Sequence, residues 1–406
     1  MRRFSQRMLP PAGAISGPGL EIAPITCSLS VGGSELLARG LPAAAACSSP
    51  SRRVQDSWLE VTYPFMRSES LRARYQLPDG RGIRWGRLFE AFDALSGDVA
   101  YRHSCGAFKE EEKAGSRLAF VTAAHDGLDI ARLDASRDLR LRSYATGVTK
   151  SAMEVRTDVA HLNANGEEED AGHVFTVMVA RRIDSEGNST AAKLPALDVS
   201  GDAAAEQRAA EAAEKQERRK RLSKTALKHS PPTPEEVPLL HARCYERSPT
   251  KVISTAEETS MSATVVSSVQ IMQWNHRNIH GNMFGGYLMR KAFELAYICA
   301  ARFDSNTSPE FIGFDDVFFR KPVHVGSIWS YTAKVCYSTP DSFRVVVEAY
   351  VDDVQAGKGE ATNEFFFVFR PSHASKEKSI VPESYQEAML WLEGRRRWKQ
   401  GEHHFD

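Results

Sequence analysis

The sequence predicts an α+β protein in which one plan, a long helix followed by antiparallel strands, occurs twice. Three observations support this fold class. Apolar residues recur at helical spacing in residues 85–102 and again in residues 284–303. Each of these segments is followed by apolar runs that are typical of strands. A charged stretch without Gly or Pro, residues 202–229, separates the two copies.

Whole-chain composition narrows the class of protein. The 406 residues carry 52 Lys and Arg against 52 Asp and Glu, so the formal net charge is zero and no nucleic-acid partner is expected. At about 100–200 residues per domain, the length predicts two or three domains. We find no apolar run of about 18 residues, so no membrane span is expected. The six cysteines form no CxxC pair, and we expect no metal site.

Residues 1–55 differ from the rest of the chain. They contain six arginines and two acidic residues, Glu21 and Glu35, among many small residues, Ser and Pro. Such a composition resembles an organelle transit peptide and predicts a mitochondrial location. A disordered leader without an address, and hence a cytoplasmic protein, is the alternative.

The first copy is expected over residues 56–195. Its helix, residues 85–102, has an apolar stripe formed by Leu88, Phe92, Leu95 and Val99. The strands that we expect around it are residues 58–64, 118–130, 139–145, 152–159 and 173–181.

Residues 196–250 are expected to form a charged helical linker. Glu and Lys or Arg stand four residues apart in the orientation that supports a helix. Almost no apolar stripe is present, so we expect the helix to be solvent-exposed. The run Arg218–Arg221 also fits a nucleic-acid patch, but a solvated connector explains it more simply.

The second copy is expected over residues 251–406, with an extension at its C-terminal end. Its helix covers residues 284–303. The strands expected after it are residues 311–320, 327–337, 342–351 and 362–369, the second and third of which are joined by a short turn.

A glycine-rich turn precedes the second helix. It contains Asn278, Gly281, Gly285 and Gly286. Glycine lets the backbone approach a ligand closely, and the first turn of a helix offers unpaired N–H groups with partial positive charge. Such a turn suits a carbonyl oxygen that becomes negative during acyl transfer. A helix entry that needs Gly for packing is the plainer reading.

The segment NIHGNMFGGYLMRKAFELAYICAARF resembles the glycine turn and central helix of hotdog-fold acyl-CoA thioesterases. FFRKPVHVGS, RWGRLFEAFDALSGD, TGVTKSAMEV and LSKTALKHSPPTPEE also resemble the mitochondrial acyl-CoA thioesterase 9-like group. The resemblance implies two tandem hotdog domains, each an antiparallel sheet wrapped around a long central helix, that form a pseudo-dimer. It also implies acyl-CoA as the substrate, no cofactor beyond this coenzyme A, and a homo-oligomer, namely a trimer of double-hotdog chains.

The resemblance also implies the site residues. The family places an Asn eight residues before the last Gly of the turn and a carboxylate seven residues after it. Counted from Gly286, these positions hold Asn278 and Phe293; counted from Gly86, they hold Pro78 and Asp93. Each copy therefore keeps only one of the two family residues: the first keeps the carboxylate and the second keeps the Asn. We expect one composite site, formed by Asp93, Asn278, Gly285 and Gly286, with Glu294 as the alternative carboxylate.

Four further residues are expected to bind substrate. Thr149 and Ser151 suit a contact with the pantetheine arm or with a water, and a polar strand edge is the alternative. Arg320 and Lys321 suit the phosphates of coenzyme A, and surface solvation is the alternative.

Three functions remain open from the sequence. The first is an acyl-CoA thioesterase that releases a carboxylic acid and coenzyme A, with Asp93 as general base or as nucleophile. The second is a hotdog hydratase or dehydratase, which needs a His paired with a carboxylate, and His280 lies near the expected place. The third is a non-catalytic acyl-CoA-binding protein.

Overall fold

The computed structural model describes residues 37–40, 51–77, 80, 82–104, 116–130, 133–225, 227, 230–245, 258–278, 280–304, 309–315, 317–353, 358–371 and 378–401. Most of the predicted leader, and Pro78 with it, lies outside the described residues.

The first half is an antiparallel sheet wrapped around one helix. Helix α3, Trp85–His103, packs against β3 (Leu59–Tyr63), β5 (Asp138–Val148), β6 (Ala152–Leu162), β7 (Glu168–Ile183) and β4 (Arg117–Ile130), which are hydrogen-bonded in that order. Two short helices, α1 (Val54–Ser57) and α2 (Glu69–Tyr75), flank the first strand. Leu88, Phe92, Leu95 and Val99, the predicted apolar stripe, are all buried.

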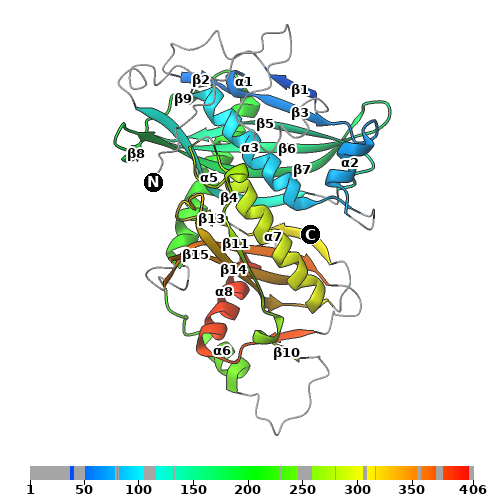
Figure 1. Ribbon diagram of the computed structural model, residues 1–406, viewed down its shortest axis with the longest axis vertical. Coiled ribbons are helices and arrows are strands. Elements are labelled where there is room, and N and C mark those ends of the chain that lie inside the picture. Colours follow the sequence, from blue (N-terminus) through cyan, green and yellow to red (C-terminus); the bar gives the residue numbers. More distant parts are fainter. Residues whose placement is uncertain are drawn as a thin grey trace, which may run out of the picture.

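The second half repeats this arrangement. Helix α7, Gly285–Phe303, lies against β16 (Lys358–Arg370), β15 (Phe343–Asp353), β14 (Ile328–Ser338) and β11 (Val266–Ile271). Phe365, Phe367 and Phe369 of β16 form an aromatic ladder on the face that meets the helix. Both halves are hotdog folds, and the predicted fold class is confirmed (Figure 1).

One expected strand, residues 311–320, is divided in the structure. It consists of β12 (Glu310–Phe314) and β13 (Val317–Phe319). Between them Asp315 forms an ion pair with the buried Arg344 at 3.3 Å. Strand β13 pairs with β16 on one side and with β4 of the first half on the other. Among the described residues, the two sheets are therefore one continuous sheet of 13 strands.

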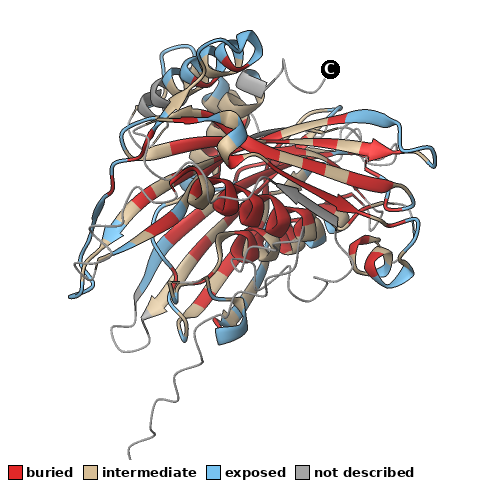
Figure 2. Cartoon of the chain, turned by 90° about the horizontal axis from the view of Figure 1, so that it is seen from above, coloured by how far each residue is buried: buried red, intermediate tan, exposed pale blue. Residues whose placement is uncertain are grey.

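The two central helices meet at the middle of this sheet (Figure 2). Phe89 of α3 and Phe293 of α7 pack edge to face with ring centroids 5.3 Å apart. The sheet curves around the helix pair, so each helix is buried by the other half as well as by its own strands. This packing places the N-terminus of each helix beside the other helix.

The segments outside the two repeats differ from the expectations in two places. Strands β1 (Leu37–Gly40) and β2 (Ser51–Arg53) pair with β3 and with β9 (Ala196–Asp198), so described structure begins before residue 56. The described side chains of the connector helix α5, Ala203–Thr225, are mostly exposed or half-buried, but one face of the helix packs on the sheet. Its Ala205 and Ala212 are buried, and Lys215 lies 3.0 Å from the ring centre of Phe175 on the outer face of the sheet.

The remaining described elements are short or peripheral. Strand β8 (Ser189–Ala191) pairs with β7, and β10 (Glu258–Ser260) pairs with β17 (Ser379–Val381). Two 3-10 turns, Ser262–Thr264 and Trp274–His276, precede α7. The C-terminal extension is helix α8, Tyr385–Gly401, which covers the outer face of β14 and is tied to α6, Glu236–Tyr245, by an ion pair between Arg396 and Glu236 at 2.6 Å.

Candidate active site

The glycine turn before α7 lies directly against α3. A Cβ added to Gly286 would stand 2.8 Å from Cα of Glu90 and 3.0 Å from Cβ of Asp93. One added to Gly285 would stand 3.0 Å from the Asp93 carboxylate. Glycine is required here because two backbones cross without room for a side chain. This close approach brings the start of one helix to a carboxylate on the other.

Asp93 is buried at this crossing, with an exposed fraction of 2%. Its Oδ2 accepts a hydrogen bond of 2.5 Å from the backbone N–H of Gly286, in the other half of the chain. Its Oδ1 accepts a hydrogen bond of 2.5 Å from the hydroxyl of Thr122 on β4. The structure thus brings Asp93 and Gly286, both named from the sequence, into direct contact.

Burial raises the pKa of Asp93 to about 6, even though its two hydrogen bonds oppose the shift. Burial penalises the charged form, whereas the Thr122 hydroxyl and the Gly286 N–H stabilise it. A carboxyl group that titrates near neutral pH suits a general base, because it is ionised at working pH and still basic enough to accept a proton.

Two residues beside Asp93 were not foreseen from the sequence. Thr122 donates to the carboxylate, and Nε2 of His125 lies 3.9 Å from Oδ1 of Asp93. His125 is buried, its Nδ1 shares a hydrogen bond of 3.1 Å with Thr176, and Nε2 has no hydrogen-bond partner among the described residues. Burial lowers the pKa of His125 to about 3, so the imidazole is neutral.

A β-bulge in β4 explains why simple alternation misses this pair. The register of β4 against β7 shifts between Thr122 and Ala124, so one extra residue enters the strand. Residues three apart, Thr122 and His125, consequently lie on the same inward face. The usable signal in the sequence is a hydroxyl and an imidazole within the otherwise apolar run 118–125.

Asn278 is held by its own turn. Its side-chain Oδ1 accepts backbone N–H groups of His280 at 2.9 Å and Asn282 at 3.1 Å. Two donors facing one atom identify that atom as the oxygen, so the amide NH2 is directed away from the turn. Among the described residues, no hydrogen bond joins Asn278 to Asp93.

The turn of Asn278 is fastened to the first half through its neighbour His280. Nε2 of His280 lies 2.7 Å from the hydroxyl of Tyr101 on α3, and that hydroxyl also accepts the N–H of Phe120 on β4 at 3.2 Å. Burial lowers the pKa of His280 to about 4. The second half therefore presents Asn278 and Gly286 to the same helix and strand that hold Asp93 and Thr122.

The pseudo-equivalent position lacks a carboxylate. Phe293 occupies the place that corresponds to Asp93 and packs against Phe89, Phe311 and Phe367. Gly86 corresponds to Gly286, and a Cβ added there would lie 2.8 Å from the Arg290 side chain.

Glu294, the alternative carboxylate, is engaged by its own helix. Its oxygens accept from Arg290 at 2.9 Å and Lys291 at 3.2 Å, and Arg84 lies at 3.8 Å. These cations lower the pKa of Glu294 despite its burial, which makes it a weak base.

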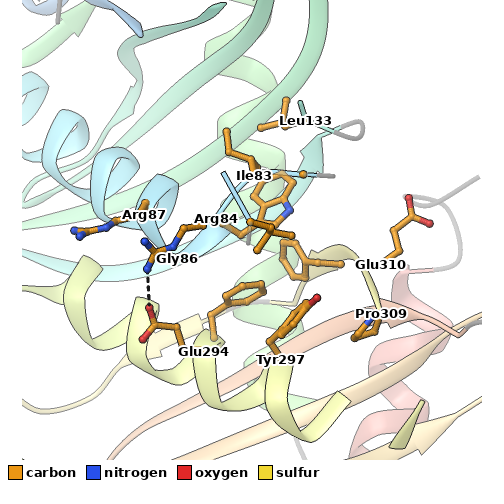
Figure 3. A pocket seen from close by; sticks show the side chains of 14 residues that line it. Ile83, Arg84, Gly86, Arg87, Leu133, Glu294, Tyr297, Pro309 and Glu310 are labelled. Atoms are coloured by element: carbon orange, nitrogen blue, oxygen red, sulfur yellow. Dashed lines mark ion pairs between the residues drawn. The ribbon is translucent and has the colours of Figure 1, made fainter. Parts of the chain in front are cut away.

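A cavity of about 540 Å³ lies at this second position and not at Asp93 (Figure 3). We call it the mirror cavity. It is lined by Ile83, Trp85, Leu133, Phe293, Tyr297 and Phe311, with Arg84 and Glu294 together at one side.

The four expected substrate-binding residues lie on two surface segments. Thr149 and Ser151 form the turn between β5 and β6, where the Thr149 hydroxyl accepts the N–H of Ala152 at 3.1 Å. Arg320 and Lys321 follow β13 and form ion pairs with Glu364 and Glu360 of β16. None of the four has a hydrogen bond or ion pair to Asp93 among the described contacts.

Two absences hold for the described residues as a whole. They contain no group of three or more His, Cys, Asp or Glu arranged to hold a metal ion. No helix among them combines the length and the apolar character needed to cross a membrane.

Comparison with curated proteins decides the family. The mitochondrial acyl-coenzyme A thioesterase 9 of Bos taurus is 32% identical over 359 residues, which cover 86% of this chain and 79% of the relative. The human protein of the same name is 32% identical over 358 residues, covering 86% and 78%. The chain belongs to the acyl-coenzyme A thioesterase 9 family. The predicted family is confirmed, and the shared mitochondrial designation supports the predicted mitochondrial location.

The chain also has more distant similarities. The mitochondrial acyl-coenzyme A thioesterase 4 of Humulus lupulus is 26% identical over 394 residues, covering 93% of this chain and 73% of the relative. An acyl-CoA hydrolase structure from Staphylococcus aureus, in complex with butyryl coenzyme A and coenzyme A, is 27% identical, with 36% of this chain and 91% of that chain covered and a TM-score of 0.34. An acyl-ACP thioesterase structure from Bacteroides thetaiotaomicron is 11% identical, with 77% and 98% covered and a TM-score of 0.42. No protein-family model matches the sequence.

Proposed function

We propose that this acyl-CoA thioesterase cleaves its substrate at one composite site, formed by Asp93 and Thr122 of the first half and by Asn278, Gly285 and Gly286 of the second. The observation that carries the proposal is the 2.5 Å hydrogen bond from Gly286 N–H to Asp93 Oδ2 across the two halves. It supports a shared site because neither half holds both partners.

The proposed reaction is hydrolysis with Asp93 as general base. Asp93, ionised above a pKa of about 6, takes a proton from a water molecule. The water oxygen attacks the thioester carbon and forms a tetrahedral intermediate. The C–S bond then breaks, coenzyme A leaves as a thiolate that takes up the proton held by Asp93, and the carboxylic acid is released. No cofactor enters this sequence of steps.

The carbonyl oxygen needs hydrogen-bond donors that are not already in use. The N–H of Gly286 already donates to Asp93. We therefore propose that the thioester carbonyl oxygen accepts hydrogen bonds from the side-chain NH2 of Asn278 and from the N–H of Gly285. The side-chain Oδ1 of Asn278 accepts two backbone N–H groups, which orients the side-chain amide before substrate arrives. A preorganised donor of this kind lowers a barrier by roughly 2.7–4 kcal/mol.

Direct attack by Asp93 on the thioester, which gives an anhydride, is the other reading of the same geometry. Hydrolysis in water enriched in oxygen-18, under single-turnover conditions, separates the two. A general base leaves Asp93 unlabelled, whereas hydrolysis of an anhydride at its enzyme carbonyl places label in the side chain.

Coenzyme A is proposed to lie along the segment after β13. Val317 of β13 pairs with His125, so Arg320 and Lys321 leave the sheet a few residues beyond the site. Both are partly exposed and paired with a carboxylate, from which the phosphates would displace them. We keep Thr149 and Ser151 as proposed contacts of the pantetheine arm, since Ala152 is two strands from Thr122 across β7.

We also propose the organisation around the site. The two halves are proposed as residues 56–195, to which β1 and β2 of the preceding leader segment add, and residues 251–406, with the linker 196–250 between them. The chain is proposed to form a homo-oligomer, as a trimer of double-hotdog chains. Sedimentation velocity of the purified chain tests that state directly, and a monomeric species contradicts it.

The site is tested by thiol release from a panel of acyl-CoAs. We expect Asp93→Asn and Asn278→Ala to lose activity. Asp98→Asn is the matched control for Asp93→Asn, because Asp98 is a second buried carboxyl group on the same helix, with its pKa raised by burial to about 7. Full activity in Asp93→Asn, or loss in Glu294→Gln alone, would move the site to the mirror position.

A hydratase is the second candidate, and one contact favours it. His125 and Asp93 form a buried histidine–carboxylate pair at 3.9 Å, which is the combination that addition of water to a 2-enoyl thioester needs. Loss of enoyl absorbance on incubation with a 2-enoyl-CoA, without thiol release, would support this candidate over the thioesterase.

A further inference from the structure

The mirror cavity is shaped for an aliphatic chain. Its walls bring together Trp85 and Phe311, with ring centroids 5.1 Å apart, and Phe293, whose ring is 4.9 Å from that of Phe311. Ile83 and Leu133 add aliphatic surface. A volume of about 540 Å³ lies within the range of small-molecule sites, roughly 300–1,000 Å³.

The polar side of the cavity has a surplus of positive charge. Glu294 is bound by Arg290 and Lys291 of its own helix, so its charge is largely neutralised without Arg84. The Arg84–Glu294 distance of 3.8 Å is too long for a hydrogen bond. Glu310, another lining residue, is bound by Arg370 at 2.8 Å. Arg84 therefore has the weakest anionic partner of the cations at this site.

The surroundings of Arg84 also favour the binding of an anion. Its burial lowers the pKa of the guanidinium, and the neighbouring charges of Arg290 and Arg87 lower it further. A group whose positive charge is disfavoured by its surroundings gains from an added anion. In Figure 3 the Arg84 guanidinium faces Glu294 at one side of the cavity, and Tyr297 lies on the other side.

We propose that the mirror cavity is a non-catalytic binding site for a free carboxylic acid with an aliphatic chain. The carboxylate binds the Arg84 guanidinium, which offers paired donors in the geometry that a carboxylate accepts. The chain lies among Ile83, Trp85, Leu133 and Phe311. Because Phe293 stands where the other site has Asp93, a ligand held here meets no catalytic carboxylate. The ligand belongs to the class of the proposed reaction product, and in that respect the inference rests on the proposed function.

The test is calorimetric titration of the full chain with sodium decanoate, with decan-1-ol as the uncharged probe. We expect Arg84→Gln to weaken decanoate binding tenfold or more while leaving decan-1-ol binding unchanged, as loss of a charged hydrogen bond predicts. Arg137→Gln is the matched control, because Arg137 has similar exposure, 32% against 36% for Arg84, has one ion-pair partner, and does not line the cavity. Glu294→Gln should tighten decanoate binding, since it removes the competing carboxylate, and it remains informative if Arg84→Gln does not fold.

Asp93→Asn separates this site from the catalytic one. The proposal requires Asp93→Asn to keep decanoate binding. It is overturned if decanoate does not bind, if binding is lost in Asp93→Asn but kept in Arg84→Gln, or if Glu294→Gln leaves affinity unchanged. Thiol release by the wild-type chain is measured separately. If decanoate does not bind, only the cavity proposal is overturned. If the wild-type chain binds decanoate at Arg84 but releases no thiol, only the proposed reaction is overturned.

Discussion

The two helix crossings at the centre of this protein share one backbone plan and differ in the side chains that they carry. At one, Asp93 of α3 accepts the N–H of Gly286; at the other, Phe293 of α7 stands near Gly86 and packs into an aromatic cluster. The polar crossing holds a carboxylate whose pKa is raised to about 6, whereas the apolar crossing opens into the mirror cavity. The repeat thus produces two equivalent backbone arrangements, and their side chains make the two crossings chemically different.

The largest expected effect on kcat comes from a substitution at the polar crossing. Asp93→Asn keeps the side-chain shape and removes the proposed base, so kcat should fall about 10²–10⁴-fold. Steady-state thiol release measures it, and circular dichroism checks that the variant is folded. Asp98→Asn, on the same helix, should keep its kcat within a few-fold; an equal loss in both variants would indicate a structural cause.

A second change asks whether the apolar crossing can be converted. Phe293→Asp places a carboxylate in an aromatic cluster that offers it no Thr122 equivalent, so it should destabilise the fold by roughly 3–5 kcal/mol. Urea denaturation measures the loss. No activity should appear in a variant that already carries Asp93→Asn; activity there would mean that the two crossings are chemically interchangeable.

A third change measures how closely the helices approach. Gly286→Ala should cost about 1–3 kcal/mol of stability and lower kcat, because its Cβ would meet Glu90 Cα at 2.8 Å. Gly97→Ala is the matched control, since a Cβ there has no atom within 4 Å. That substitution should be neutral or stabilise the helix by about 0.5–1 kcal/mol. Thermal melts of both variants measure the change in stability. Equal melting temperatures for the two variants would contradict the close approach of the helices at Gly286.

The smallest expected effect concerns the pH profile. The Thr122 hydroxyl lowers the pKa of Asp93, so Thr122→Val should raise that pKa above about 6. Since the base acts when ionised, activity is lost as pH falls through this pKa, and the acid limb of kcat/KM should move to higher pH. Thr122→Ser should restore the wild-type limb. An unchanged limb in Thr122→Val would remove Thr122 from the site.

The two repeats can be recognised from the amino-acid sequence. Expected helices at residues 85–102 and 284–303 correspond to Trp85–His103 and Gly285–Phe303, because burial on one face imposes helical spacing on apolar residues. Four of the five strands expected in the first half lie within observed strands, and the fifth, residues 58–64, exceeds β3 by one residue at each end. The contact of α5 with the sheet was not predicted, since alanines that pack flat on a sheet leave no apolar stripe in the sequence.

The site can be recognised only in part. The resemblance to hotdog thioesterases, carried over along each glycine turn by the family's spacing, implied Asp93, Asn278, Gly285 and Gly286 of the proposed site. Thr122 and His125 could not be found by counting, since the bulge in β4 that turns both inward is a property of the pairing with β7. The division of residues 311–320, which lets β13 join the two sheets, likewise depends on partners distant in the chain.

Local pattern therefore dictated which residues become helix, strand and glycine turn, and which half carries the carboxylate. Packing alone decided that Gly286 meets Asp93, that a buried carboxyl group there has its pKa raised to about 6, and that Arg84 faces an aromatic cavity at the opposite crossing. The physical reason is that spacing along one segment fixes directions within that segment, whereas distances between segments, and the burial that shifts a pKa, arise when two halves of the chain close on each other.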